Sequence, residues 1–303
     1  ISKSLRLLFS DMFDTSLPAL REVRTSQDGS TKFALSGWDG LVIESVLIPE
    51  KDRNTLCISS QIGCRMGCRF CVTGQIGFIR NLEVSEIVGQ VMAVKKWCAG
   101  RMITNLVFMG MGEPLDNRDN LFKALTILKE PFGLDFSHRR ITISSVGLVD
   151  GLRLIEPKMA GLAISLNAAD NETRNLLMPI NRLYPLEEVM RFIEGFKSPN
   201  RERITLEYVM IRGINDSLDD AKKLVALLKR VRCKINLIPY NESDRLEFQS
   251  PDAQVVRRFQ EYLLGERFTA IVRDSRGGDV GGACGQLGIE YLKEKRNGDT
   301  SCL

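Results

Sequence analysis

Three closely spaced cysteines are the residues of this sequence with the clearest chemical potential. They form the segment Cys64-Arg-Met-Gly-Cys68-Arg-Phe-Cys71, a C-x3-C-x2-C spacing. A structural zinc ion takes four tetrahedral ligands, and ferredoxin clusters are also held by four thiolates, in a different run. Because this group stops at three, it favours a cubane 4Fe–4S cluster with one iron open to another ligand. Zinc with a distant fourth ligand, or three unligated loop cysteines, is the alternative.

The cysteine spacing resembles that of radical S-adenosylmethionine (SAM) enzymes, in which the open iron chelates the amino and carboxylate groups of SAM. A second short segment, Gly110-Met-Gly112-Glu113-Pro114, follows an apolar run. Glycine lets the backbone approach a ligand closely, and a carboxylate beside it can receive an ammonium group. In a radical SAM barrel this segment would hold the amino group of SAM. An ordinary strand-to-helix turn is the alternative.

Two further cysteines and one carboxylate are also candidates for chemistry. Cys284 lies in a glycine-rich segment, which suits a nucleophile, a redox partner or a fourth cluster ligand. Cys57, just upstream of the cluster segment, could pair with Cys284 or could be a small buried hydrophobe. Glu44 lies inside an apolar run. If it is buried, its pKa rises and suits proton transfer, whereas at a sheet edge it would face water.

Small polar residues end several of the apolar runs. Caps and turns favour these residue types, so a local structural role is one interpretation. The other is hydrogen bonding to the ribose and carboxylate of SAM, by Ser144, Ser165, Asn167 and Asn241.

Length and composition describe an ordinary globular protein that works in a reducing compartment. The 303 residues can form one large α/β domain with an appendage, and 44% are hydrophobic and 26% charged. No apolar run approaches the roughly 18 residues that span a membrane. Eight cysteines without framework spacing argue for metal or catalytic roles in the cytoplasm. A net charge of +4 tolerates a polyanionic partner without demanding one.

The order of elements predicts a barrel behind a short extension. A helix before Pro18 and strand-like runs at 21–24, 32–35 and 41–48 form the extension, a β-meander. Beyond it, strands alternate with helices, which implies a parallel sheet with right-handed crossovers. The strands are expected at 55–60, 103–109, 140–145, 162–166, 204–210, 234–239 and 269–273. The helices are expected at 84–97, 120–128, 148–155, 185–196, 218–230 and 251–264.

We therefore predict an α/β fold, a partial (β/α)6 radical SAM barrel. Residues 1–49 would be the remnant of an accessory domain with the meander, residues 50–279 the barrel, and residues 280–303 the loop of Cys284 and a tail. Because parallel barrels place their chemistry at the carboxyl ends of the strands, the candidate residues should meet at one rim.

The chain resembles the radical SAM RNA adenine methyltransferases, the RlmN/Cfr family. The matching segments run in family order across nearly the whole chain: Cys57-Ile-Ser-Ser-Gln-Ile-Gly-Cys64, Cys68-Arg-Phe-Cys71-Val-Thr-Gly, Phe108-Met-Gly-Met-Gly-Glu-Pro114, Arg139-Arg-Ile-Thr-Ile-Ser144, Ile164-Ser-Leu166, Ile238-Pro-Tyr-Asn241 and Ala283-Cys-Gly-Gln-Leu287. The pairing of the cluster segment with the last of these is highly specific.

The resemblance implies the cofactors and their ligands. A 4Fe–4S cluster would be held by Cys64, Cys68 and Cys71. SAM would be bound by Gly112, Glu113, Ser144, Ser165, Leu166, Asn167 and Asn241. Family members commonly carry His at the position of Asn167, which puts that side-chain contact in doubt. The chain also begins near the end of the family's amino-terminal helical domain, which helps to grip RNA.

The resemblance also implies a two-stage reaction with two SAM molecules. The Cys284 thiolate takes a methyl group from one SAM. Reductive cleavage of a second SAM gives a 5′-deoxyadenosyl radical, which removes hydrogen from that S-methyl group. The methylene radical adds to an adenine ring carbon, and Glu44 takes the ring proton. Attack of Cys57 on Cys284 then releases methyladenine and leaves a disulfide.

The family has two branches, which methylate carbon 2 or carbon 8 of adenine. The segment Cys71-Val-Thr-Gly resembles the carbon-8 (Cfr) branch, whereas Val84-Ser-Glu-Ile-Val-Gly-Gln-Val resembles the commoner carbon-2 branch, which we favour. The implied partners are 23S rRNA, tRNA and an electron donor such as flavodoxin or ferredoxin. We expect a monomer that does not associate with a membrane. A zinc or Fe–S module that binds RNA without catalysis is the alternative. A glycyl-radical activase would not need Cys57 and Cys284.

Overall fold

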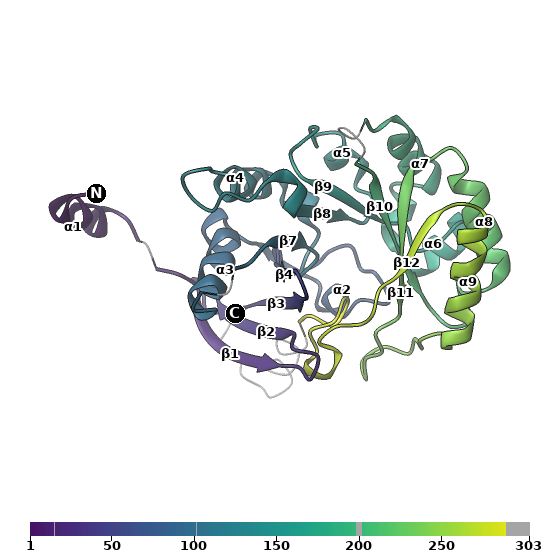
Figure 1. Ribbon diagram of the computed structural model, residues 1–303, viewed down its shortest axis with the longest axis horizontal. Coiled ribbons are helices and arrows are strands. Elements are labelled where there is room, and N and C mark those ends of the chain that lie inside the picture. The colour runs from purple at the N-terminus through teal and green to yellow at the C-terminus, as the bar shows by residue number, and fades with distance from the viewer. Residues whose placement is uncertain (15, 101, 198–201, 289–303) are drawn as a thin grey trace.

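The computed structural model describes residues 1–14, 16–100, 102–197 and 202–288 (Figure 1). In these residues one ten-stranded sheet runs in the order β1-β2-β3-β4-β7-β8-β9-β10-β11-β12. Its strands are β1 (Ala19–Thr25), β2 (Thr31–Ser36), β3 (Val42–Glu50), β4 (Arg53–Cys57), β7 (Asn105–Phe108), β8 (Ile141–Ser145), β9 (Gly161–Ser165), β10 (Ile204–Met210), β11 (Cys233–Pro239) and β12 (Thr269–Val272). A separate hairpin pairs β5 (Gln61–Gly63) with β6 (Phe78–Asn81).

The helices lie mainly between the parallel strands of this sheet. They are α1 (Lys3–Met12), α2 (Val72–Ile76), α3 (Val84–Trp97), α4 (Arg118–Leu128), α5 (Val149–Leu152), α6 (Asn171–Leu177), α7 (Leu186–Gly195), α8 (Leu218–Leu228) and α9 (Ala253–Gly265). In the ten-stranded sheet every pairing from β4 to β12 is parallel, and helical segments connect the successive strands. The predicted α/β fold with a partial barrel is confirmed.

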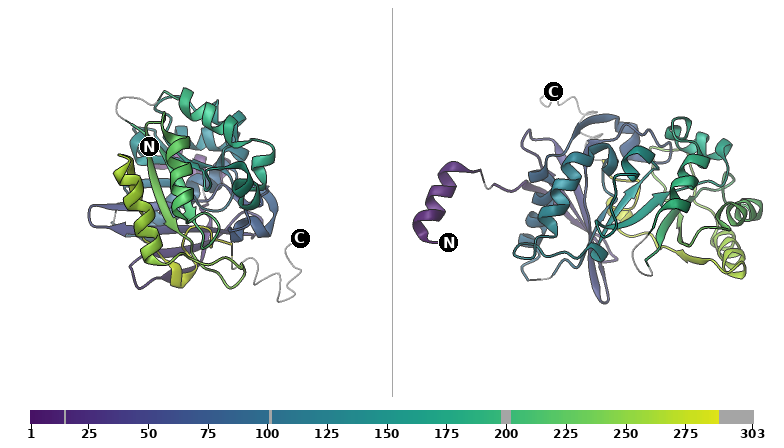
Figure 2. Two further views of the ribbon diagram at one scale, coloured as in Figure 1. Left: turned by 90° about the vertical axis from the view of Figure 1, so that its right-hand side faces the viewer. Right: turned by 90° about the horizontal axis from the view of Figure 1, so that it is seen from above.

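The β-meander continues the barrel sheet. Strands β1, β2 and β3 pair antiparallel in sequence, and β3 then pairs antiparallel with β4, the first barrel strand. The register sets Val46 of β3 opposite Cys57 of β4. Because alternate residues of a strand face the same side, Glu44 and Cys57 lie on one face of the sheet. Helix α1 stands apart from the body of the molecule, and none of its residues is buried (Figure 2).

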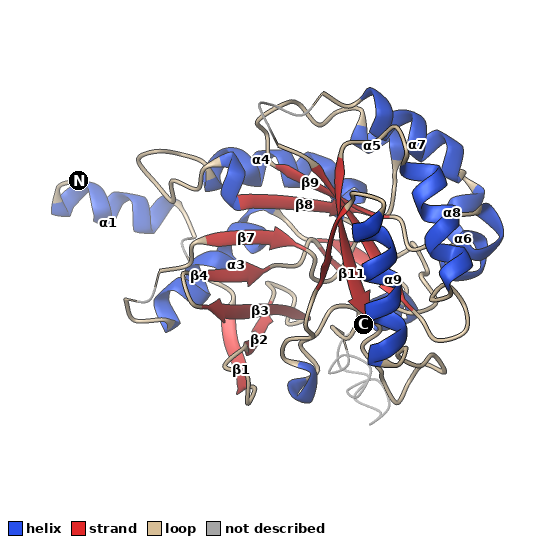
Figure 3. Ribbon diagram, turned by 45° about the vertical axis from the view of Figure 1, so that its right-hand side comes forward, coloured by secondary structure: helices blue, strands red, loops and turns tan. Residues whose placement is uncertain are grey.

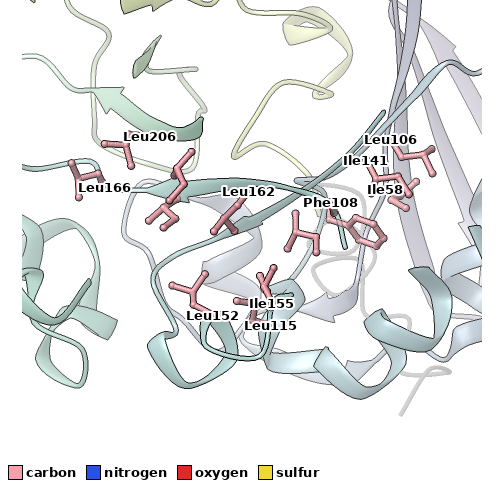
Figure 4. Close-up of a cluster of buried hydrophobic side chains, with 14 of the residues drawn as sticks. Ile58, Leu106, Phe108, Leu115, Ile141, Leu152, Ile155, Leu162, Leu166 and Leu206 are labelled. Atoms are coloured by element: carbon pink, nitrogen blue, oxygen red, sulfur yellow. The ribbon is translucent and has the colours of Figure 1, made fainter. Parts of the chain in front are cut away.

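The hydrophobic core lies between the sheet and the helices outside it. Figure 3 shows helices such as α4, α7 and α9 on the outside of the strands. Helix α7 buries Leu186, Val189, Met190 and Ile193, the i, i+3, i+4, i+7 stripe of an amphipathic helix. The strands contribute alternate apolar residues to this core, including Leu106, Phe108, Ile141 and Leu162 (Figure 4).

The opposite face of the same strands is polar and lines the barrel interior. Thr55, Asn105, Thr142, Thr205 and Asn236 come from five different strands and border one internal cavity. A barrel interior with polar walls leaves room for a polar ligand. None of the helices in the described ranges is both long and apolar enough to cross a membrane.

Candidate active site

A cavity opens at the carboxyl ends of the barrel strands, and we call it the rim cavity. It contains about 860 Å³ of empty space, its open mouth included. Its wall includes residues near the carboxyl ends of β7, β8, β9, β10 and β11, as expected for a parallel barrel. Of the candidate residues it brings together Cys68, Cys71, Gly112, Glu113, Ser144, Ser165, Asn167, Asn241 and Cys284.

The three clustered cysteines lie in the loop between β5 and α2, beside the rim cavity. The amide N–H of Cys71 donates to the carbonyl of Cys68 over 3.1 Å, and the amide of Cys64 donates to the carbonyl of Gly77 over 2.9 Å. Apolar side chains surround the three thiols, among them Met66, Phe70, Leu177, Met178 and Tyr240. Burial raises the pKa of all three thiols, that of Cys64 to about 12.

The chemistry of these thiols suits an iron–sulfur cluster. Thiolates in such apolar surroundings require a compensating positive charge, which bound iron supplies. Among the described residues, no group of three or more His, Cys, Asp or Glu side chains is placed to hold a metal ion. As thiols in apolar surroundings, Cys64, Cys68 and Cys71 have the chemistry of cluster ligands.

The turn that carries Glu113 is built on a neighbouring glutamine that sequence reasoning missed. The side-chain oxygen of Gln61 accepts from the Glu113 amide over 2.8 Å, and its nitrogen donates to Asp116 over 2.7 Å. At Gly112, with φ +94°, a Cβ would clash with Gln61, so only glycine fits this turn. The Glu113 side chain is buried, which raises the pKa of its carboxyl to about 7. It accepts from the amide of Val146 over 3.0 Å.

Two of the expected SAM ligands have side chains that are already engaged in the fold. Asn167 adopts a positive φ of 58°, and its side-chain oxygen accepts from the Val209 amide over 2.9 Å. Its side-chain nitrogen lies 3.2 Å from the Met178 sulfur. Leu166 is fully buried and does not line the rim cavity. Any contact of Leu166 with a ligand would therefore come from its backbone.

Arg174 is a second residue that sequence reasoning missed. It is 0% exposed, and burial lowers the pKa of its guanidinium to about 10. The guanidinium donates to the carbonyls of Val146 over 2.7 Å and Leu166 over 3.2 Å, and to the side chain of Asn181 over 2.6 Å. These contacts fix the loops after β8 and β9, so Arg174 positions two walls of the rim cavity. No periodicity of the short helix α6 marks it in the sequence.

The loop of Cys284 is fixed to both sides of the site. The amide of Val72, next to the last cluster cysteine, donates to the carbonyl of Gly285 over 2.7 Å. The side-chain amide of Asn241, at the end of β11, donates to the carbonyl of Cys284 over 2.9 Å. Cys284 itself remains accessible to solvent, although surrounding atoms raise the pKa of its thiol and Arg273 opposes that rise. Cys284 also lines the rim cavity.

Cys57 and Cys284 border a second, smaller cavity, which we call the thiol cavity. Its wall also contains Met109, Glu207 and Arg273. Cys57 is 7% exposed. The pKa of its thiol is raised mainly by burial and further by the nearby Cys284. Both cysteines are free thiols in this structure. Cys284 therefore lines both the rim cavity and the thiol cavity.

Glu44 is buried, and its partner is a buried lysine that sequence reasoning also missed. The Lys32 ammonium lies 2.9 Å from one carboxylate oxygen of Glu44. The other oxygen accepts from the amide of Gly288 over 2.7 Å, in the segment that follows Cys284. Lys32 also donates to the carbonyl of Gly281 over 3.3 Å. Glu44 therefore joins the meander to the Cys284 loop. The sequence does place a lysine on β2, the strand that pairs with β3, which contains Glu44.

Comparison with known proteins identifies clear relatives. Residues 58–227 match the Radical SAM superfamily. The chain is 50% identical to the dual-specificity RNA methyltransferase RlmN of Geotalea uraniireducens over 266 residues, which cover 88% of this chain and 77% of that protein. It is 49% identical to RlmN of Geobacter sulfurreducens, over 95% of this chain and 79% of that protein.

A solved structure shares this arrangement. The crystal structure of a radical SAM methyltransferase from Sphaerobacter thermophilus superposes with a TM-score of 0.90 at 39% identity, over 94% of this chain and 85% of that chain. The segment that matches the superfamily contains the three clustered cysteines and Glu113. Glu44, Cys57 and Cys284 lie outside that segment.

Proposed function

This chain belongs to the RlmN family of RNA methyltransferases within the radical SAM superfamily, and on that premise we propose that it methylates carbon 2 of an adenine in 23S rRNA and in tRNA. Its cofactors are a 4Fe–4S cluster and SAM. Membership in an enzyme family sets aside the alternative of a non-catalytic RNA-binding module. The observation that most supports the proposal is the thiol cavity, which Cys284 and Cys57 share beside the rim cavity.

The rim cavity supports binding of both cofactors. Cys64, Cys68 and Cys71 would hold the cluster, and the carboxyl of Glu113 would receive the ammonium group of SAM. The bound cluster would supply the one-electron chemistry that makes a methyl group reactive and would take the electron back at the end. We also infer a flavodoxin or ferredoxin as the external electron donor, and a monomer that acts in the cytoplasm.

Cys284 is the proposed methyl carrier. Its thiolate would displace the methyl group of one SAM, forming a carbon–sulfur bond and leaving S-adenosylhomocysteine. Burial raises the pKa of this thiol, and Arg273 counteracts the rise and so favours the thiolate that the displacement needs. A hydrogen atom would then pass from the S-methyl group to the 5′-deoxyadenosyl group of the second SAM, which allows a carbon–carbon bond to the adenine. Amidine carbons of adenine are not nucleophilic, which is why simple methyl-cation transfer would fail.

Glu44 and Cys57 would complete the reaction. The Glu44 carboxylate, paired with Lys32, would take the proton from the adenine carbon after the bond forms. The Cys57 thiolate would attack the sulfur of Cys284, so that the carbon–sulfur bond breaks and a disulfide forms. The electron pair of that bond goes to the methylene carbon, which becomes a methyl group when it takes up a proton.

Mass spectrometry of nucleosides tests this proposal. Anaerobically reconstituted protein is incubated with SAM, a reductant and unmethylated rRNA or tRNA, and the RNA is digested to nucleosides. We expect 2-methyladenosine from the wild type and none from Cys284→Ala. Detection of 8-methyladenosine would assign the chain to the other branch, to which Cys71-Val-Thr-Gly is similar. SAM cleavage without any methyladenosine would contradict the proposal.

A further inference from the structure

Glu207 is a buried carboxyl group with one oxygen that accepts no hydrogen bond from the described residues. It lies on β10, is 5% exposed, and lines both the rim cavity and the thiol cavity. Its Oε1 atom accepts from the side-chain amide of Asn236 over 2.9 Å. Its Oε2 atom has no hydrogen-bond partner in the described part of the chain. Burial raises the pKa of Glu207, and both Arg273 and Asn236 counteract this rise.

An unsatisfied buried oxygen in this position points to a ligand. Leaving a buried polar atom without a partner costs about 1 to 3 kcal/mol, and native structures contain few such atoms. Thr205, two residues earlier on β10, lines the same barrel interior. A small polar residue of that kind at position 207 would fit the strand without leaving a carboxyl oxygen unsatisfied. The group that satisfies Oε2 must bring a hydrogen-bond donor. Because Glu207 borders the space that Cys57 and Cys284 share, a ligand in that space can supply the donor.

The target adenine has such a donor and has to enter that space. In the proposed function Cys284 and Cys57 both act on the target base, so the base must sit within reach of the thiol cavity. The amino group at carbon 6 distinguishes adenine from bases with a carbonyl there, and enzymes read flipped bases by such hydrogen bonds. We propose that Oε2 of Glu207 accepts a hydrogen bond from the exocyclic amino group of the target adenine. This inference rests on the proposed function.

SAM is the competing source of a donor. Glu207 also lines the rim cavity, and SAM has ribose hydroxyls and an amino group of its own. If Oε2 served SAM, its loss would weaken SAM binding without changing the choice of base. A change in base preference would therefore assign Oε2 to the adenine, and a change in the KM for SAM would assign it to SAM.

A specificity exchange in Glu207→Gln tests the proposal. The amide of Asn236 donates to Oε1, so the introduced glutamine should turn its carbonyl to Asn236 and its NH2 group to the cavity. A donor in place of the acceptor should disfavour the adenine amino group and favour a carbonyl. RNAs that carry adenosine or inosine at the methylated position are compared in wild type and variant. We expect the preference of kcat/KM for adenosine over inosine to fall about 100-fold, or about 2.7 kcal/mol.

Two further variants complete the experiment. Glu207→Leu, which has neither donor nor acceptor, should bring adenosine and purine ribonucleoside, which lacks the amino group, within about threefold of each other. Thr205→Val, on the same face of β10 but outside the thiol cavity, should keep the wild-type preferences. Thermal melting and iron content of each variant verify that it folds and binds its cluster.

The outcomes separate this inference from the proposed function. Wild-type preferences in Glu207→Gln, with a raised KM for SAM in RNA-free methylation of Cys284, would assign Oε2 to SAM and overturn the inference. Wild-type preferences with an unchanged KM for SAM would also overturn it. If the wild type methylates adenosine, neither result affects the proposed function. If the wild type methylates no adenosine, the proposed function fails and this inference fails with it.

Discussion

The Nζ atom of Lys32 lies 2.9 Å from Oε1 of Glu44, and the two side chains are 3% and 1% exposed. The residues come from β2 and β3, where Ala34 is the direct partner of Glu44, so the pair spans the ladder diagonally. Removing one partner of a buried ion pair leaves the other charge without compensation. If Glu44 accepts a proton as proposed, Lys32 should be needed to keep the buried carboxylate compensated.

The substitution Lys32→Met tests the role of this pair. We expect a loss of about 3 kcal/mol in the free energy of unfolding, because Glu44 is left buried without its cation. A neutral Glu44 cannot accept a proton, so methyladenine formation should fall at least tenfold. Urea unfolding gives the stability, and nucleoside mass spectrometry gives the activity.

The double variant Lys32→Met/Glu44→Leu is the control for that experiment. It removes both charges, so most of the lost stability should return. Activity should remain low because the carboxyl group is missing. If Lys32→Met retains wild-type stability and wild-type methylation, the ion pair has no role in either.

Replacement of Cys57 should trap the RNA on the enzyme. A packing role for Cys57 would make Cys57→Ala cost about 1 kcal/mol or less and leave turnover intact. As the attacking thiolate, Cys57 supplies a step that alanine cannot, so RNA should stay bonded through Cys284. On a denaturing gel with labelled RNA, we expect a slow band in Cys57→Ala that is missing in Cys57→Ala/Cys284→Ala. Normal methylation without that band would return Cys57 to a structural role.

SAM binding should weaken at low pH because of Glu113. Its pKa in the free protein is about 7, raised by burial, whereas pairing with the SAM ammonium requires the carboxylate. Below pH 7 the protonated carboxyl must release its proton on binding, so affinity should fall by up to tenfold per pH unit. Equilibrium dialysis of labelled SAM between pH 5.5 and pH 8 measures this, with roughly constant affinity expected above pH 7.5. The same slope in Glu113→Gln would show that another group titrates.

The three clustered cysteines should determine iron content. Reconstituted wild-type protein should be brown and contain about four irons per chain, with a paramagnetic resonance signal that SAM perturbs. Alanine at Cys64, Cys68 or Cys71 should abolish that signal. Cys233→Ala is the matched control, since Cys233 begins β11 away from the rim and should not affect iron binding. Stoichiometric zinc without iron uptake would contradict the cluster.

The barrel could be predicted from the sequence because its elements have clear periods and boundaries. Helix α3 spans the expected residues 84–97, and β10 spans the expected 204–210. Helix α6 was missed because Asn171–Leu177 is too short to show a helical period. The β5–β6 hairpin was missed because its two strands pair across the cysteine loop, which no local pattern reveals.

Only those parts of the site that lie in recognisable sequence motifs could be predicted. The cysteine loop, the turn of Glu113 and the Cys284 loop have recognisable spacing. Buried charges such as Lys32 and Arg174 do not, because composition assigns charged residues to the surface by default. Their burial follows from strand register and packing between distant segments. The expected tail after residue 288 lies outside the described residues.

The superfamily segment, residues 58–227, ends before the Cys284 loop and starts just after Cys57. The two flanks meet over it, since the amide of Gly288 donates to Glu44 and that of Val72 to Gly285. The segment common to the superfamily is thus bordered by two flanks that contact each other, and these carry the proposed methyl carrier, resolving thiol and proton acceptor. If those roles hold, changes confined to the flanks should alter the transferred group or the attacked atom while the superfamily segment keeps its sequence.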